Sequence, residues 1–264
     1  MIKIENTEVN GIARAVYAAR NPLNSWSRSD SDLSTDVLGE NDLDLAKRLA
    51  KAGPEHAKYR RMIVVYADIT APLYWWKEHD TYKVGTVANS CSTMHKIHSK
   101  PIEASDFSVD YFHFADDYNE MSTEDYLAYV VRACEEMRMM YLETGDKRYW
   151  RALIQLLPTS YNQRRTVMLN YEVLAAMYRQ RKDHKLDEWR EFCGWIKTLP
   201  YADELITMEG EKMEKTRAED FFEKHPAAPK KDNIPVTCVK LCGYGEYTEC
   251  DSSCKKCWDM PMDG

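Results

Sequence analysis

Asn170 and Arg181 are two polar side chains whose spacing could serve a binding site. On a single helix the eleven steps between them come to about three turns, so both would lie on one face. Leu174 and Met177 lie between them on that face. An arginine and an asparagine at the two ends of an apolar stripe suit the binding of a polar ring or a phosphate. The alternative is that Arg181 is one of several solvated basic residues at a helix end.

The segment 71–98 is the second stretch that could carry chemistry, because it mixes hydrogen-bonding side chains with aromatic rings that could stack on a planar ligand. His95 and His98 are weak evidence for a metal site at their spacing. Cys91 has no adjacent base or helix end that would activate a thiol. A polar surface loop with its tryptophans in the core is an open alternative. The residues concerned are Tyr74, Trp75, Trp76, Glu78, His79, Asp80, Thr81, Tyr82, Lys83, Thr86, Asn89, Ser90, Ser92 and His95.

Five cysteines crowd the C-terminal end of the chain. Of these, Cys254 and Cys257 have the two-residue spacing of zinc sites. Four thiolates can close a tetrahedral structural site, so we expect a zinc site from Cys242, Cys250, Cys254 and Cys257; disulfides or free thiols are the alternatives. The three cysteines elsewhere in the chain are expected to be free thiols.

Composition excludes several classes of protein. The chain has 264 residues and a formal net charge of -7, which disfavours non-specific nucleic-acid binding. No apolar run approaches the about 18 residues that span a membrane. The N-terminus lacks an apolar signal core, so we expect a cytoplasmic protein without membrane partners.

The elements that must hold these residues follow from periodicity and from breaking residues. Most are helices, and at least one is a strand, which predicts an α+β fold. We expect three parts: a domain over residues 1–200, a charged linker or arm over 201–235, and a Cys-rich tail over 236–264. The expected elements are a helix from Asn41 to Gly53, a strand at Met62–Tyr66 before Ala71-Pro72, and helices from Ser122, over Lys147–Leu157, over Thr166–Lys182 and over Leu186–Leu199.

Three features mark the C-terminal half of the chain: Leu157-Pro158, Asn170 and Arg181. Their spacing resembles that in the C-terminal half of flavin-dependent thymidylate synthases. Ala18-Ala19-Arg20 resembles that family's Ala-Ala-Arg, and His56 resembles the histidine after its first helix. Val64 to Pro72 resembles its strand ending in Ala-Pro. The resemblance covers roughly residues 12 to 200 and implies a mostly helical domain with a small antiparallel sheet, here followed by the Cys-rich tail.

Two motifs depart from the family pattern. The family's Gln-x-x-Arg-His-Arg-x-x-Ser stands here as Glu78 to Thr86, with Thr81-Tyr82-Lys83 in place of Arg-His-Arg. Its Asn-Glu-x-Ser-x-Arg-Tyr stands as Asn89 to His95. Carried over residue by residue, the resemblance implies catalytic roles for Arg181 and Glu78, cofactor contacts from His56, Thr81, Tyr82, Lys83 and Asn170, and substrate contacts from Arg181, Lys83, Ser90 and Ser92.

The activity that the resemblance implies is one-carbon transfer to a pyrimidine deoxynucleotide, dUMP above all, in a homotetramer. FAD would be the cofactor, with NADPH and methylenetetrahydrofolate as co-substrates. Arg181 would stabilise negative charge on the pyrimidine. Glu78, which only accepts hydrogen bonds when ionised, would favour a donor-rich base edge such as a cytosine amino group. The alternatives are a non-catalytic nucleotide-binding protein on the same scaffold and an unrelated helical interaction module.

Overall fold

The computed structural model describes residues 2–110, 122–208 and 217–225, and further 228, 230–231 and 234–235. Two compact units divide the chain, Met1–Met208 and Glu209–Gly264. In the second unit, helix α8 spans Arg217–Lys224, and the short strands β5, Lys230–Lys231, and β6, Ile234–Pro235, pair antiparallel. The five C-terminal cysteines, including Cys242, Cys250, Cys254 and Cys257, lie outside the described residues.

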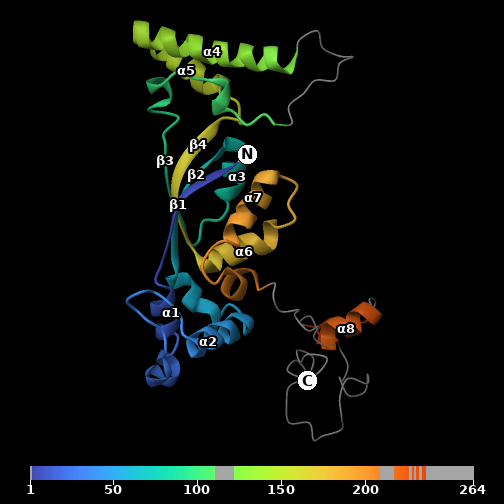
Figure 1. Ribbon diagram of the computed structural model, residues 1–264. Helices are drawn as coiled ribbons and strands as arrows, with labels where there is room; N and C mark the ends of the chain where they lie inside the picture. Colours follow the sequence, from blue (N-terminus) through green and yellow to red (C-terminus); the bar gives the residue numbers. More distant parts are fainter. Residues whose placement is uncertain are drawn as a thin grey trace, which may run out of the picture. The chain divides into compact units, whose positions relative to one another are not determined.

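The first unit is built on a four-stranded antiparallel sheet. Its strands lie in the order β1 (Lys3–Asn10), β2 (Val64–Pro72), β4 (Asn162–Asn170) and β3 (Thr86–Ser90), as Figure 1 shows. All neighbouring strands run antiparallel, and a bulge interrupts the pairing of β1 with β2 between Glu5 and Glu8. β2 and β4 therefore form the centre of the sheet, and β3 is an edge strand.

Helices make up most of the remaining structure, so the expected α+β fold with a small antiparallel sheet is confirmed. No described helix has the length and apolar character needed to cross a membrane. The α-helices of the first unit are α1 (Ile12–Ala18), α2 (Glu40–Lys51), α3 (Leu73–His79), α4 (Thr123–Thr144), α5 (Lys147–Leu156), α6 (Tyr171–Arg181) and α7 (Asp187–Ile196). Short 3-10 helices span Asn21–Leu23, Trp26–Arg28, Ala57–Met62, Ile97–Ser99 and Ala104–Asp106, and a π-helical turn spans Asp203–Thr207.

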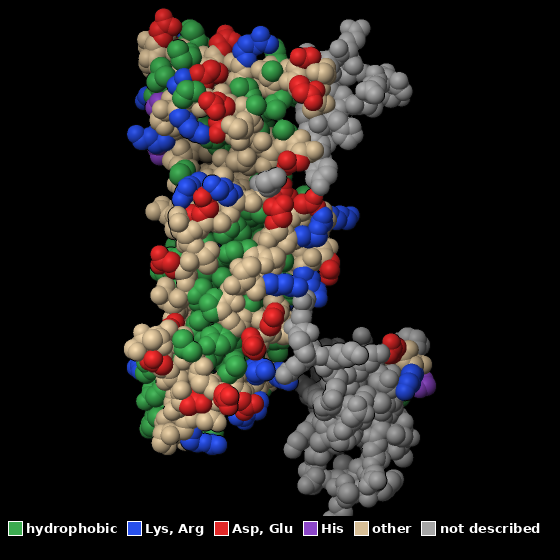
Figure 2. Space-filling model, in the orientation of Figure 1, with side chains coloured by type: hydrophobic (Ala, Val, Ile, Leu, Met, Phe, Trp, Pro, Cys, Tyr) green, Lys and Arg blue, Asp and Glu red, His purple; other side chains and the backbone are tan. Residues whose placement is uncertain are grey.

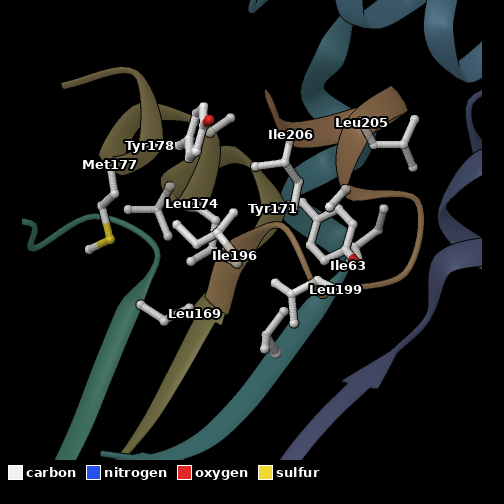
Figure 3. Packing of buried hydrophobic residues seen from close by; sticks show 14 of the residues in the cluster. Ile63, Leu169, Tyr171, Leu174, Met177, Tyr178, Ile196, Leu199, Leu205 and Ile206 are labelled. Carbon is white, nitrogen blue, oxygen red and sulfur yellow. The ribbon is translucent and has the colours of Figure 1, made fainter. Parts of the chain in front are cut away.

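The main core lies between one face of the sheet and helices α3, α6 and α7. Alternate residues of β2 point into it, from Val65 to Ala71, as expected for a strand with one covered face. In Figure 3, Leu174 of α6 and Ile196 of α7 point toward one another above Leu169 of β4. This packing fixes the ends of α3 and α6 over the same face of the sheet.

A second, smaller core joins α4 and α5 to the segment after β3. Cys134 and Leu153 are fully buried there, with Ile97, Ile102 and Phe107 around them. On the side of the molecule that Figure 2 shows, apolar side chains form a band along the middle of the first unit, with charged groups around it. The pair α4 and α5 thus has an apolar cluster separate from the main core under α3, α6 and α7.

The prediction of one helix over Thr166–Lys182 is wrong. Residues up to Asn170 belong to strand β4, which pairs with β2 on one side and β3 on the other. Helix α6 begins only at Tyr171. Val167 and Leu169 are therefore buried as alternate residues of a strand. Asn170 lies between the two elements, and the helical face inferred from its spacing to Arg181 does not exist.

Other expected boundaries lie close to the observed ones. Ser122 caps α4 by accepting a hydrogen bond from the Asp125 backbone, which confirms the predicted start. The helix expected from Asn41 begins one residue earlier, at Glu40, so Asn41 does not cap α2. Asp30 accepts hydrogen bonds from the Asn41 and Asp42 backbone. The first unit ends at Met208, later than residue 200.

Candidate functional site

Glu78 and Arg181 are far apart in the sequence and in direct contact in the structure. Glu78 is in the last turn of α3, and Arg181 ends α6. Both helices follow central strands of the sheet and pack on its covered face (Figure 1). Arg181 Nη1 donates to Glu78 Oε2 at 2.7 Å, and the side chains are 20% and 35% exposed. The two residues with implied catalytic roles therefore form an accessible ion pair.

Two aromatic residues hold this ion pair. Arg181 Nε donates to the Tyr82 hydroxyl at 2.9 Å, and its guanidinium lies 4.7 Å from the centre of the Trp189 ring. Trp189 Nε1 donates to Glu78 Oε2 at 3.0 Å. Stacking on an aromatic face stabilises a guanidinium while leaving its edge available for hydrogen bonds. Trp189 thus contacts both partners of the ion pair.

His184 and Gln180 complete the group. The Tyr82 hydroxyl donates to Gln180 Oε1 at 2.8 Å. His184 Nδ1 accepts a hydrogen bond from the Leu186 backbone, so the neutral ring carries its proton on Nε2. That nitrogen lies 3.5 Å from Glu78 Oε2. We call Glu78, Tyr82, Gln180, Arg181, His184 and Trp189 the Glu78–Arg181 cluster.

The turn from Thr81 to Gly85 connects this cluster to the other end of α6. Asn170 caps α6 there, with its Oδ1 accepting from the Val173 backbone at 2.9 Å. Gly85 has a φ of +80°, and a Cβ on it would lie 2.5 Å from Asn170 Nδ2. Lys83 is exposed in this turn, between the Tyr82 end and the Gly85 end. The structure therefore brings Glu78, Tyr82 and Arg181 together and places Lys83 next to Tyr82, whereas Asn170 lies at the opposite end of α6, about 16 Å from Arg181.

His56, Ser90 and Ser92 are not part of this arrangement. His56 directly precedes the 3-10 helix Ala57–Met62, and among the described residues no hydrogen bond or ion pair joins it to the Glu78–Arg181 cluster. Ser90 ends β3, roughly 13 Å from the start of that strand, and Ser92 lies beyond it. Lys83 precedes β3, so Lys83 and Ser92 lie at opposite ends of the strand.

Ser92 instead lines a polar pocket of about 390 Å³ beyond the end of β3. Three cationic side chains line it, Lys96, Lys100 and Arg164. Lys100 is paired with Asp106 at 2.5 Å, and Arg164 with Asp68 at 2.8 Å. Arg164 also lies 3.9 Å from Glu5, so Lys96 is the cation of this pocket with no carboxylate partner among the described residues. A lysine with hydroxyl groups around it suits a phosphate group.

Buried aromatic residues of α3 lie next to the cluster. Trp75 and Trp76 are fully buried, and Arg165 stacks on the Trp76 ring at 4.2 Å while pairing with Asp80 at 2.7 Å. Burial among these rings lowers the pKa of His79 to about 4, so this histidine is neutral at pH 7. The tryptophans of the segment 71–98 are thus core residues, as the alternative interpretation of that segment predicted. Glu78 and Tyr82 of the same segment belong to the Glu78–Arg181 cluster.

No pattern in the sequence pointed to Trp189, His184 and Gln180 as members of the cluster. Trp189 lies in the helix expected over Leu186–Leu199, and it is fully buried. No spacing rule connects α7 to α3, because their contact depends on how both helices pack on the sheet. The one signal in the sequence was that His184 and Trp189, whose rings carry N–H donors, follow the predicted site residue Arg181 within eight positions.

No group of metal-binding side chains exists among the described residues. Cys91 is exposed, and Cys134 and Cys193 are buried free thiols. Burial raises the pKa of the Cys193 thiol to about 11 and also raises that of Cys134, so neither is a thiolate at pH 7. The expected zinc ligands in the tail stay a prediction.

No family model matches the sequence, and no curated protein matches it significantly. Solved structures do match the fold. Thymidylate synthase X (ThyX) from Helicobacter pylori with FAD and dUMP superposes with a TM-score of 0.57 at 17% identity, over 79% of this chain and 98% of that chain. A second complex of this flavin-dependent enzyme with FAD and dUMP gives 0.56 at 18% identity, over 78% and 98%.

The chain has the flavin-dependent thymidylate synthase fold. A UMP/dUMP methylase, PolB from Streptomyces cacaoi bound with 5-Br dUMP, also superposes, with a TM-score of 0.52 at 14% identity over 79% of this chain and 95% of that one. Nearly the whole of each of these proteins is thus represented here. In this chain the Glu78–Arg181 cluster lies on that fold.

Proposed function

We propose that the protein transfers a one-carbon unit to a pyrimidine deoxynucleotide with the help of bound FAD. The observation that carries this proposal is the Glu78–Arg181 cluster, an oriented guanidinium on a fold whose solved members include complexes with FAD and dUMP. NADPH and methylenetetrahydrofolate are the proposed co-substrates, and a homotetramer in the cytoplasm is the proposed form.

Arg181 is the proposed catalytic residue because its charge is held in place before a ligand arrives. Its Nε and Nη1 are bonded to Tyr82 and Glu78, and its plane lies against Trp189. A guanidinium that needs no reorientation stabilises negative charge on a pyrimidine oxygen or nitrogen as the transition state forms. Glu78, as the ion-pair partner, orients this guanidinium.

Cationic side chains that could bind the phosphates of FAD lie near both ends of β3, and hydroxyl groups accompany them. Lys83 is the exposed cation beside the cluster, and Ser92, Lys96 and Arg164 line the polar pocket at the opposite end. Lys96 and Arg164 would hold a diphosphate there, and Lys83 a phosphate near Arg181. A bound flavin supplies the hydride chemistry that none of these side chains can perform.

A non-catalytic nucleotide-binding protein is the second candidate, and the Thr81-Tyr82-Lys83 turn favours it. The Thr81 hydroxyl donates to the Glu78 carbonyl oxygen at 2.7 Å, and the Tyr82 hydroxyl is bonded to Gln180 and Arg181. Two of these three proposed cofactor contacts are thus engaged within the protein. Lys83 alone offers an exposed charge in this turn.

A flavin absorbance titration tests the proposal. We expect the purified protein to shift the FAD bands, and a pyrimidine deoxynucleotide to shift them again. Replacement of Arg181 by Ala should weaken nucleotide binding by about 10- to 100-fold, because a hydrogen bond to a charged group is lost. Arg179→Ala, an exposed arginine on the same helix, is the matched control and should bind normally.

Two results would count against the proposal. Nucleotide binding without any flavin signal at saturating FAD would favour the non-catalytic candidate. Equal nucleotide affinity in Arg181→Ala and Arg179→Ala would remove Arg181 from the site. Absence of nucleotide binding by the wild-type protein would favour the helical interaction module.

A further inference from the structure

The Glu78–Arg181 ion pair leaves one edge of each partner uncommitted. The contacts from Arg181, Trp189 and His184 all fall on Glu78 Oε2. Among the described residues, no hydrogen bond is made to Glu78 Oε1 or by Arg181 Nη2. A free acceptor and a free two-proton donor are therefore left on the two partners of one partly exposed ion pair.

This arrangement is rigid enough to discriminate between ligands. Hydrogen bonds from Arg181 and Trp189 hold the Glu78 carboxylate, and Tyr82 and Trp189 hold the plane of the guanidinium. A side chain held in this way does not rotate to offer a different pattern to a ligand. Specificity for a base then depends on how its donors and acceptors match the acceptor Glu78 Oε1 and the two protons of Arg181 Nη2.

Cytosine presents the complementary edge. Its 4-amino group donates, and its N3 and O2 are two adjacent acceptors. The amino group can pair with Glu78 Oε1 while N3 accepts from Arg181 Nη2, and the donor that faces the carboxylate then has only one acceptor beside it on the base. Carboxylates are the side chains that accept from a cytosine amino group in nucleic-acid recognition as well.

Uracil fits the same pair less well. Its only donor on this edge, N3–H, lies between two carbonyl oxygens. A carboxylate that accepts this proton lies close to both carbonyls, which are also electron-rich. Only one of the two carbonyls can then face Arg181, and the other is left against Glu78 without a donor.

We propose that Glu78 makes this site selective for a cytosine deoxynucleotide over a uracil deoxynucleotide. The inference rests on the proposed function, since it specifies the base that the same site binds. It assigns Glu78 a role in specificity through a direct contact with the base, in addition to orienting Arg181.

Calorimetric titration of the full-length protein, with and without FAD, tests the inference, with dCMP and dUMP as the probes. We expect dCMP to bind at least about tenfold more tightly than dUMP. Glu78→Gln should remove that preference, because an amide both donates and accepts and can pair with either base. Asp80→Asn is the matched control: it removes a carboxylate two residues away that pairs with Arg165, and it should keep the preference.

The outcomes separate this inference from the proposed function. Tighter binding of dUMP by the wild-type protein overturns the inference and leaves nucleotide binding in place. A dCMP preference that survives in a folded Glu78→Gln variant also overturns it, because the selectivity then comes from another group. Binding of neither nucleotide, with or without FAD, overturns the proposed function and the inference with it.

Discussion

His79 is buried one position after Glu78, with 3% of its surface exposed. Its ring packs against Trp75, Trp76 and Phe192. Burial is the main reason that its pKa falls to about 4; Asp80 opposes this effect, and Arg165 adds to it. A histidine in the unfolded chain has a pKa near 6.5. The folded protein therefore keeps His79 neutral over a pH range in which the unfolded chain takes up a proton.

This difference predicts a specific acid sensitivity. Above about pH 6.5 both states are neutral, so His79 contributes no pH dependence. As the pH falls from 6.5 to 4, only the unfolded state binds the proton, and the free energy of unfolding falls by up to ~3 kcal/mol. Urea unfolding between pH 7 and 4.5 measures this loss. His79→Phe, which fills an aromatic site without a titrating group, should show a smaller loss.

His56→Phe is the control for that prediction, because His56 is exposed. Its stability should follow the wild-type pH curve. The carboxylates whose hydrogen bonds lower their pKa to about 2, Asp32 and Asp68, lose most of their contribution at lower pH and add little within this window. Parallel curves for wild type and His79→Phe would show that the folded protein accommodates the protonated ring.

At this same scale, the sequence indicated the chemistry of Arg181 and Glu78 but not their contact. The resemblance placed both in the active centre, and the structure joins them. Nothing in local spacing could show that Trp189 donates to Glu78, since the indole reaches it from a third helix. Ser92 and Lys83 lie at opposite ends of β3, although the motif had placed both at the substrate, and their roles stay a prediction.

At the scale of elements, the junction of β3 with α6 depends on Gly85 and Asn170. Gly85 adopts a positive φ and lies directly against the Asn170 side chain, which caps α6. Asn170→Ala should cost about 1 kcal/mol of stability through the lost cap. Gly85→Ala should cost more, because the backbone strain of about 1 kcal/mol adds to a clash with Asn170 Nδ2.

The double variant measures how these two residues depend on each other. Removing the Asn170 amide removes the atom that an alanine at position 85 would meet. The two costs should therefore sum to more than the cost of the double variant, by about 1 kcal/mol in urea unfolding. Gly53→Ala is the control, since Gly53 has a φ of +106° but nothing within 4 Å of an added Cβ. Additive costs for Gly85→Ala and Asn170→Ala would contradict the close approach.

The segment around Asn170 also explains why one predicted helix was wrong. Val167, Leu174 and Met177 fit a helical period, but Val167 and Leu169 also fit the period of a strand. The ambiguity is resolved by partners far away in the sequence, since β2 and β3 pair with both edges of β4. Helices α5 and α7, where Pro158 and Pro200 follow the predicted ends, were recognisable from the chain alone.

At the scale of the whole molecule, the fold class followed from the sequence, but the arrangement of the sheet did not. Strand β1, Lys3–Asn10, has few apolar residues and was not expected. It is held by pairing with β2, whose residues lie more than fifty positions later in the chain. The order of the four strands therefore depends on long-range pairing that periodicity does not encode.

The end of the first unit gives the last prediction. Leu205 and Ile206 are buried in the main core, and the Tyr201 hydroxyl accepts a hydrogen bond from the Leu38 backbone. A chain that ends at Met208 keeps all of these groups and should unfold cooperatively, with an intact main core. A chain that ends at Pro200 loses two large buried side chains, and since each such loss costs about 2–5 kcal/mol, it should be less stable by at least ~4 kcal/mol. Urea midpoints of the two truncated proteins measure the difference, and Leu205→Ala in the full-length chain should reproduce part of it. Equal midpoints for the two truncations would mean that residues 201–208 contribute nothing to the core, and that the domain ends at residue 200, as the sequence predicted.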